Sequence, residues 1–157
     1  PVLIGTFAMG PVAGASIELV KILLNFIING TTTAGVGEMA NFLIGCALVV
    51  PAGIIYRRKR TRTGAIIGMA TGTVFMTLIG CLLNAYMLLP AYATAFQMPI
   101  DALVAMGTAV NGSINSLLTF VAFAVAPFNL LKGVLVSLIV FLIYKKISPV
   151  FRMNSQA

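Results

Sequence analysis

The sequence has very little charge. Only 8% of its 157 residues are charged, and its acidic residues are limited to Glu18, Glu38 and Asp101. A soluble domain carries roughly 25% charged residues. Hydrophobic residues make up 60% of the chain, and the mean hydropathy is +1.07. These values exclude an ordinary soluble domain and predict an integral membrane protein whose length suits one compact bundle.

Residues that carry out catalysis are also scarce. Histidine and tryptophan are absent, and there are two cysteines. The sequence contains no G-x-x-x-x-G-K-[ST] phosphate loop, no H-E-x-x-H motif and no nucleophile beside a base. Cys46 and Cys81 lie inside apolar stretches without metal-ligand spacing, so we expect small core residues there and neither a disulfide nor a ligand pair. We therefore expect no enzyme, no metal site and no resident cofactor.

Positive charge, by contrast, is concentrated in one place. The net charge is +7, and five of the ten cations lie in "RRKRTR" (57–62) between two apolar stretches. A basic cluster can bind nucleic acid, but a loop between membrane spans explains this one better, because Lys and Arg anchor cytoplasmic loops. We expect a lipid bilayer around the chain and no nucleic-acid partner.

Five apolar segments run along the chain, and together they predict an all-α membrane domain over residues 1–157. Segments of about twenty apolar residues are long enough to span a bilayer. The predicted segments are 2–10, which is short and ends at a helix-breaking "GP", then 11–29, 37–57, 63–89 and 114–146. The stretch 90–113 is too interrupted to span, which favours an external loop or a short interfacial helix.

The distribution of Lys and Arg predicts the orientation. "RRKRTR" precedes the fourth segment, and Lys145, Lys146 and Arg152 follow the fifth. Antiparallel hairpins place both groups on one side, which the positive-inside rule makes cytoplasmic. The outer side then carries the loop "GTTTAGVG" (30–37) and the stretch 90–113.

Polar residues within the apolar segments gather in their outer halves. Glu38 and Asn41 are one helical turn apart, and Asn129 and Lys132 share one face of the fifth segment. Asn84 lies at the outer end of the fourth segment. Charged side chains at membrane depth are costly and usually face a protein interior or water. We therefore predict that these five residues converge on one ligand pocket, toward which Pro127 bends the fifth helix.

Several of these residues have a structural alternative. Lys132 is expected either to bind a ligand or to neutralise Glu18 or Glu38, and Glu38 either to bind a ligand or to stabilise a helix start. Glu18 and Lys21 are i, i+3 neighbours, which favours a simple ion pair. The small-residue stripe formed by Gly64, Gly68 and Gly72 favours packing within the bundle over docking of a separate subunit.

Three stretches resemble a known family: "VLIGTFAMGPVAGASIELVK" (2–21), "GVGEMANFLIG" (35–45) and "APFNLLKGVLVSL" (126–138). They are similar to the riboflavin-specific substrate-binding subunits, or S-components, of energy-coupling factor (ECF) vitamin transporters in Gram-positive bacteria. "RRKRTRTGAIIG" (57–68) and "IYKKISP" (143–149) extend the similarity over nearly the whole chain.

The resemblance implies a six-helix membrane bundle that captures riboflavin from outside. It also implies three partners, namely a transmembrane coupling subunit and two cytoplasmic ATPase subunits. The family's G-E-x-x-N-F motif falls on Glu38 and Asn41, and its P-F-N-x-x-K motif on Asn129 and Lys132, whereas Asn84 fits the pattern more loosely. The family's first helix, with its A-x-x-x-A contact surface, is expected to be missing, which leaves about five helices in this chain.

Other functions fit the same observations. S-components share a fold while their pockets differ, so another vitamin or flavin mononucleotide (FMN) is an alternative ligand. From a different class, the chain would be a small membrane enzyme or a structural subunit. Stoichiometric flavin binding without turnover would separate these readings.

Overall fold

The computed structural model describes residues 1–31 and 33–153, and side chains as far as residue 143. Every regular element in the described part of the chain is helical. The helices are α1 (Val2–Met9), α2 (Pro11–Asn29), α3 (Val36–Arg58), α4 (Arg62–Leu83), α5 (Leu89–Ala95), α6 (Ile100–Val110), α7 (Leu117–Phe120) and α8 (Ala126–Met153). Two π-helical turns, η1 (Asn84–Leu88) and η2 (Val121–Val125), join α4 to α5 and α7 to α8. This outcome confirms the all-α fold class predicted from composition.

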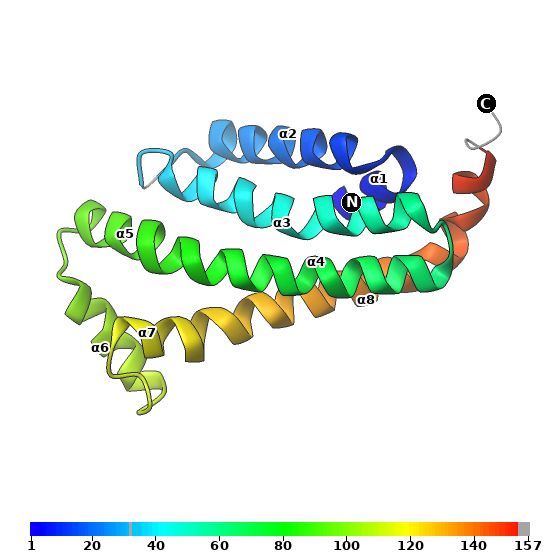
Figure 1. Cartoon of the computed structure of the whole chain (residues 1–157). Coiled ribbons are helices and arrows are strands. Elements are labelled where there is room, and N and C mark those ends of the chain that lie inside the picture. Colours follow the sequence, from blue (N-terminus) through cyan, green and yellow to red (C-terminus); the bar gives the residue numbers. More distant parts are fainter. Residues whose placement is uncertain (32, 154–157) are drawn as a thin grey trace.

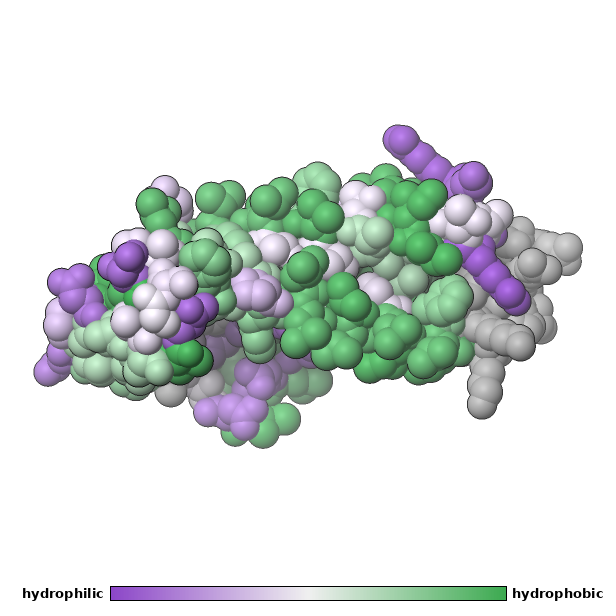
Figure 2. Space-filling model, turned by 90° about the horizontal axis from the view of Figure 1, so that it is seen from below, coloured by the Kyte–Doolittle hydropathy of each residue, from purple (hydrophilic) through white to green (hydrophobic). Residues whose placement is uncertain are grey.

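Four helical segments are long and apolar enough to cross a membrane. They are Pro11–Asn29, Val36–Arg58, Arg62–Ala95 and Leu117–Ile143. Figure 1 shows them lying alongside one another, with α1 folded back beside the start of α2. Figure 2 shows an apolar belt across the middle of the molecule and polar side chains toward its ends. The chain is therefore a multi-pass membrane protein.

The break between α1 and α2 lies at Gly10. This residue has φ +100°, a conformation that glycine adopts without steric cost, and Pro11 follows at the first position of α2. The predicted "GP" break is thus confirmed. The break lets α1 turn back and bury Leu3 and Phe7 against α3.

The closest packing in the bundle is between α3 and α4. Gly64, Gly68 and Gly72 are all buried, and a Cβ placed on Gly68 would lie 2.8 Å from the carbonyl oxygen of Ala52 on α3. Small residues let two helix backbones approach this closely. The glycine stripe therefore packs within the bundle, as the sequence favoured.

The outer part of the fourth segment differs from the prediction. The helix was expected to end near residue 89, but it continues to Ala95 through η1 and past Pro90. Proline has no N–H and removes one backbone hydrogen bond, and the wider π turn before it accommodates the interruption without ending the helix. The stretch that follows contains the short helix α6, which has no buried residue. A short helix was one of the two alternatives expected here, and its interfacial position stays a prediction.

Pro127 is likewise preceded by a π turn. The π turn η2 ends two residues before it, as η1 ends two residues before Pro90. The bend predicted at Pro127 stays a prediction, and the structure shows a π turn that leads directly into α8.

Both basic segments belong to the same end of the bundle. The connection between α3 and α4 and the carboxyl end of α8 lie together on the right of Figure 1, opposite the connection between α2 and α3. The antiparallel arrangement assumed for the orientation is therefore present.

Candidate functional site

An open cavity lies among α1, α2, α3, α4 and α8. Its volume is about 410 Å³, and most of its wall is aliphatic. The apolar side chains that line it are Val2, Leu3, Ile22, Ile44, Leu48, Val49, Met76 and Val136. Binding sites for small molecules have volumes of roughly 300–1,000 Å³ and combine apolar walls with a few polar groups. This cavity has that size and character.

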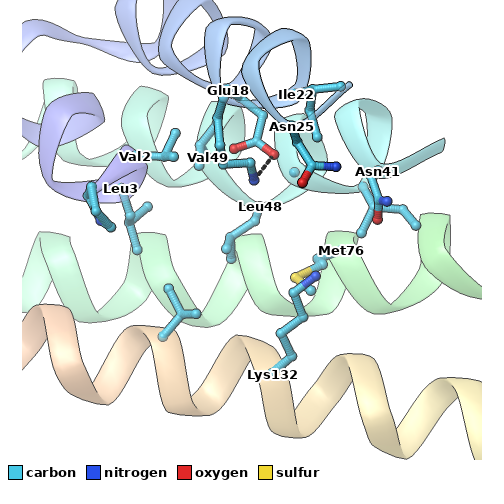
Figure 3. Close-up of a pocket in the computed structure, with 15 residues that line it drawn as sticks. Val2, Leu3, Glu18, Ile22, Asn25, Asn41, Leu48, Val49, Met76 and Lys132 are labelled. Atoms are coloured by element: carbon cyan, nitrogen blue, oxygen red, sulfur yellow. Dashed lines mark hydrogen bonds and ion pairs between the residues drawn. The ribbon is translucent and has the colours of Figure 1, made fainter. Parts of the chain in front are cut away.

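The polar groups of the cavity come from three helices. Glu18, Lys21 and Asn25 project from α2, Asn41 from α3 and Lys132 from α8. Figure 3 shows the Lys132 side chain extending from α8 past Met76, toward the side chains of α2 and α3 on the opposite wall. The site thus has cationic, anionic and amide groups around one apolar space.

Glu18 is the most deeply buried of these groups. It is 2% exposed, and its carboxylate accepts a hydrogen bond from the ammonium of Lys21, with which it forms an ion pair. The Lys21 side chain remains 54% exposed. The predicted pairing of these two residues is therefore confirmed.

Room for the Glu18 carboxylate comes from a glycine on the facing helix. A Cβ placed on Gly45 would overlap Glu18 Oε1, and it would lie 2.8 Å from Glu18 Cγ. Gly45 lines the cavity together with Glu18. The position of the acidic group therefore depends on a missing side chain in α3.

Lys132 forms no ion pair with any of the described side chains. Glu18 pairs with Lys21, and Glu38 accepts a hydrogen bond from Thr31 Oγ1 at 3.0 Å. The ammonium of Lys132 has Glu18 and Lys21 as its electrostatic neighbours. Since neither candidate carboxylate holds it, Lys132 can donate hydrogen bonds to a molecule in the cavity.

The structure brings two of the five predicted site residues to the cavity, namely Asn41 and Lys132. Asn129 is 5% exposed, and it donates to the carbonyl oxygen of Val125 in its own helix at 3.0 Å. Asn84 likewise donates to the carbonyl oxygen of Gly80 at 2.7 Å. Glu38 lies in the first turn of α3, beside the loop that holds Thr31. The ligand role of all five residues stays a prediction.

Sequence reasoning missed part of the α2 wall. The sequence favoured an ion pair between Glu18 and Lys21, with Glu18 as an alternative partner of Lys132, and it did not single out Asn25. These three residues are spaced i, i+3 and i+7 and so lie on one face of a largely apolar helix. A polar stripe on one face of an apolar span is a signal that indicates an internal cavity.

These features, a bundle of apolar helices around a cavity with a few polar groups, define a solute-binding membrane protein. The chain belongs to the family "ECF transporter, substrate-specific component", whose model matches residues 1–144. This family consists of transporter components, in agreement with the predicted transport subunit and not with an enzyme.

The chain is similar to named proteins from several bacteria. The chain is 34% identical to "Riboflavin transporter RibU" of Staphylococcus aureus (strain TCH60) over 94% of its length and 71% of the relative's. It is 31% identical to "Riboflavin transporter FmnP" of Bacillus subtilis (strain 168) over 95% of its length and 73% of the relative's.

A solved structure is also similar. It is described as "Structure and mechanism of the S component of a bacterial ECF transporter", with a TM-score of 0.69 and 31% sequence identity. The match covers 95% of this chain and 74% of that one. The fold, the family and the location in a bacterial membrane therefore agree with the predictions from sequence.

Proposed function

We propose that this chain is the riboflavin-binding S-component of an ECF transporter. The observation that carries the proposal is the cavity, which Glu18, Asn41 and Lys132 line together with mostly aliphatic side chains. Relatives that cover nearly the whole chain are named riboflavin transporters, which supports the choice of ligand. In this reading riboflavin is the transported substrate and not a cofactor.

Riboflavin suits such a cavity chemically. Its isoalloxazine ring is a flat plate with an imide edge, and its ribityl chain is a row of hydroxyl groups. The aliphatic wall would cover the plate, and the ammonium of Lys132 and the amide of Asn41 would bond to carbonyl and hydroxyl groups. The Glu18 carboxylate supplies an acceptor for N–H or O–H groups.

FMN is the second candidate ligand. The cavity is lined by two lysines and one glutamate, so its charged groups carry a net charge of +1. A cationic cavity favours a ligand with a phosphate group. Direct competition between riboflavin and FMN would decide which of the two binds more tightly.

The family also suggests the partners. We propose that a transmembrane coupling subunit and two cytoplasmic ATPase subunits complete the transporter. Since the sequence has no phosphate loop, ATP hydrolysis would be supplied by the ATPase subunits.

The test is purification in detergent, followed by a search for bound flavin. We expect a yellow protein that quenches riboflavin fluorescence at a ratio of one ligand per chain and leaves the flavin chemically unchanged. A folded, monodisperse protein that binds neither riboflavin nor FMN would contradict the proposal, and saturable binding of another vitamin would redirect it within the family.

A further inference from the structure

A second cavity of about 410 Å³ lies at the basic end of the bundle and shares no lining residue with the first. It is formed where α1 turns into α2 at Gly10 and where α3 ends. Residues 6–10 make one side of it. Tyr56, Arg57 and Arg60 make the other.

The floor of this cavity is tightly packed. Thr6, Phe7 and Tyr56 are each 5% exposed or less, and the rings of Phe7 and Tyr56 lie 4.5 Å apart. Gly53 adds no side chain, and a Cβ there would lie 2.6 Å from Thr6 Cγ2. Tight packing below and the glycine break beside it therefore hold the hollow open.

The mouth of this cavity is cationic and has no acidic counterpart. Arg57 and Arg60 line it with exposed side chains. The three carboxylate residues of the sequence lie elsewhere, and the ion pair between Glu18 and Lys21 is the one formed among the described side chains. Two guanidinium groups without a carboxylate partner suit a phosphate oxyanion, which accepts paired N–H donors.

An apolar surface continues from this cavity along the membrane-facing side. Met9, which lines the cavity, is 64% exposed, and Val12 in the first turn of α2 is 77% exposed. The exposed apolar side chains continue along α2 through Leu19 and Leu23 to Ile27. The site therefore combines a cationic hollow with an adjoining apolar track of one helix length, which is the chemistry of a phospholipid and not of a free anion.

We propose that this cavity binds the phosphate headgroup of an anionic membrane lipid, whose acyl chains lie along α2. Clusters of basic residues at a membrane surface attract anionic lipids. The cavity would hold the phosphate group at one position beside Arg57 and Arg60, in addition to this diffuse attraction. The lipid would be held at the hinge between α1 and α2, in the leaflet at the basic end of the bundle.

Two charge-matched double variants test the assignment. Arg57→Gln with Arg60→Gln removes the cations of the cavity, whereas Arg58→Gln with Arg62→Gln removes two cations of the same cluster that do not line it. The measurement is native mass spectrometry of the purified protein, titrated with dioleoylphosphatidylglycerol or, as the neutral headgroup control, dioleoylphosphatidylcholine.

We expect the cavity variant to bind phosphatidylglycerol about tenfold more weakly than the charge-matched variant, a difference of about 1.4 kcal/mol. Phosphatidylcholine should bind equally to both. Equal losses of phosphatidylglycerol in the two variants would show diffuse surface attraction and overturn the proposal. Displacement of the lipid by millimolar inorganic phosphate would overturn it as well, since the site would then be one for a free anion.

A second pair of variants retains the charge. Arg57→Lys with Arg60→Lys keeps both cations but loses the planar forks, and we expect a several-fold weaker affinity. The matched Arg58→Lys and Arg62→Lys protein should bind as the wild type does. Circular dichroism and size-exclusion profiles confirm that each variant is folded, and equal affinity of all lysine variants would contradict a shaped phosphate site.

Discussion

Two regions of the bundle use α3 in opposite ways. Toward α4, Gly68 and its neighbours in the stripe bring backbones together so closely that no side chain fits between them. Toward α2, the missing side chain of Gly45 leaves space that the carboxylate of Glu18 fills, and both residues line the cavity. The comparison shows that a glycine on a membrane helix can close an interface or open a site, depending on the residue opposite.

The strongest way to break the closed interface is Gly68→Leu. The new side chain would meet the backbone of Ala52, which cannot move aside as a flexible side chain could. We expect a loss of about 3 kcal/mol in the free energy of unfolding, at the upper end for overpacked cores. The measurement is thermal unfolding in detergent.

Ile67→Leu is the control for this substitution. Ile67 is 47% exposed, and its replacement by leucine leaves the side-chain volume unchanged. An unchanged melting temperature in Gly68→Leu would show that the two helices are not held at the observed distance.

The second prediction concerns the open side of α3. Lys132→Ala should weaken riboflavin binding by about ten- to a hundredfold, because a hydrogen bond to a charged group is worth roughly 1.5–3 kcal/mol. The melting temperature should stay near that of the wild type, since Lys132 forms no ion pair with the described side chains. Fluorescence quenching of riboflavin gives the affinity.

Leu131→Ala serves as the neighbouring control, because Leu131 is 58% exposed and does not line the cavity. If Lys132→Ala lowered the melting temperature while affinity stayed unchanged, the lysine would have a structural role only.

A third prediction concerns the glycine that makes room for Glu18. Gly45→Ala should displace the Glu18 carboxylate and lower riboflavin affinity by about tenfold, or about 1.4 kcal/mol. Adding Glu18→Ala removes the obstructed group, so the alanine at position 45 should then have no further effect. A double-mutant cycle measures this coupling. Additive effects of the two substitutions would show that Gly45 does not act through Glu18.

The smallest energetic effect belongs to a test of orientation. In a background without Cys46 and Cys81, single cysteines at the exposed Lys59 and Ser113 should leave stability unchanged. Because Lys59 lies in the basic loop, it should resist a membrane-impermeant thiol reagent in intact cells, while Ser113 should react. The opposite labelling pattern would contradict the orientation predicted from Lys and Arg.

Hydropathy was sufficient to predict the four long spans, because runs of about twenty apolar residues match the thickness of a bilayer. It did not predict that the fourth span passes Pro90, since a sequence does not show whether a π turn will absorb the missing hydrogen bond. Local sequence patterns also did not determine whether the asparagine side chains point into the cavity or bond to the backbone. Asn84 and Asn129 each bond to a carbonyl of their own helix, an option that polar residues in apolar helices always retain.

The sequence predicted that an internal cavity exists, but it did not predict all of the residues that line it. Charges at membrane depth indicated an internal site, and Lys132 lies there. Glu18 was harder to assign, because its role depends on Gly45, a residue on another helix that only the fold brings opposite it. Spacing within one helix carries no information about such a partner.

The π turn η2 also determines how the direction of Lys132 depends on the number of residues before it. A π turn contains one residue more than the α-helical path would need, and each residue of an α-helix rotates the following face by about 100°. Deleting one residue between Val121 and Val125 would therefore restore a regular helix and leave Lys132 on nearly the same face, whereas deleting one residue of α8 between Ala126 and Lys132 would rotate the lysine away from the cavity. The direction of Lys132 thus tolerates the loss of a residue within η2 but not within the α-helical residues that follow it.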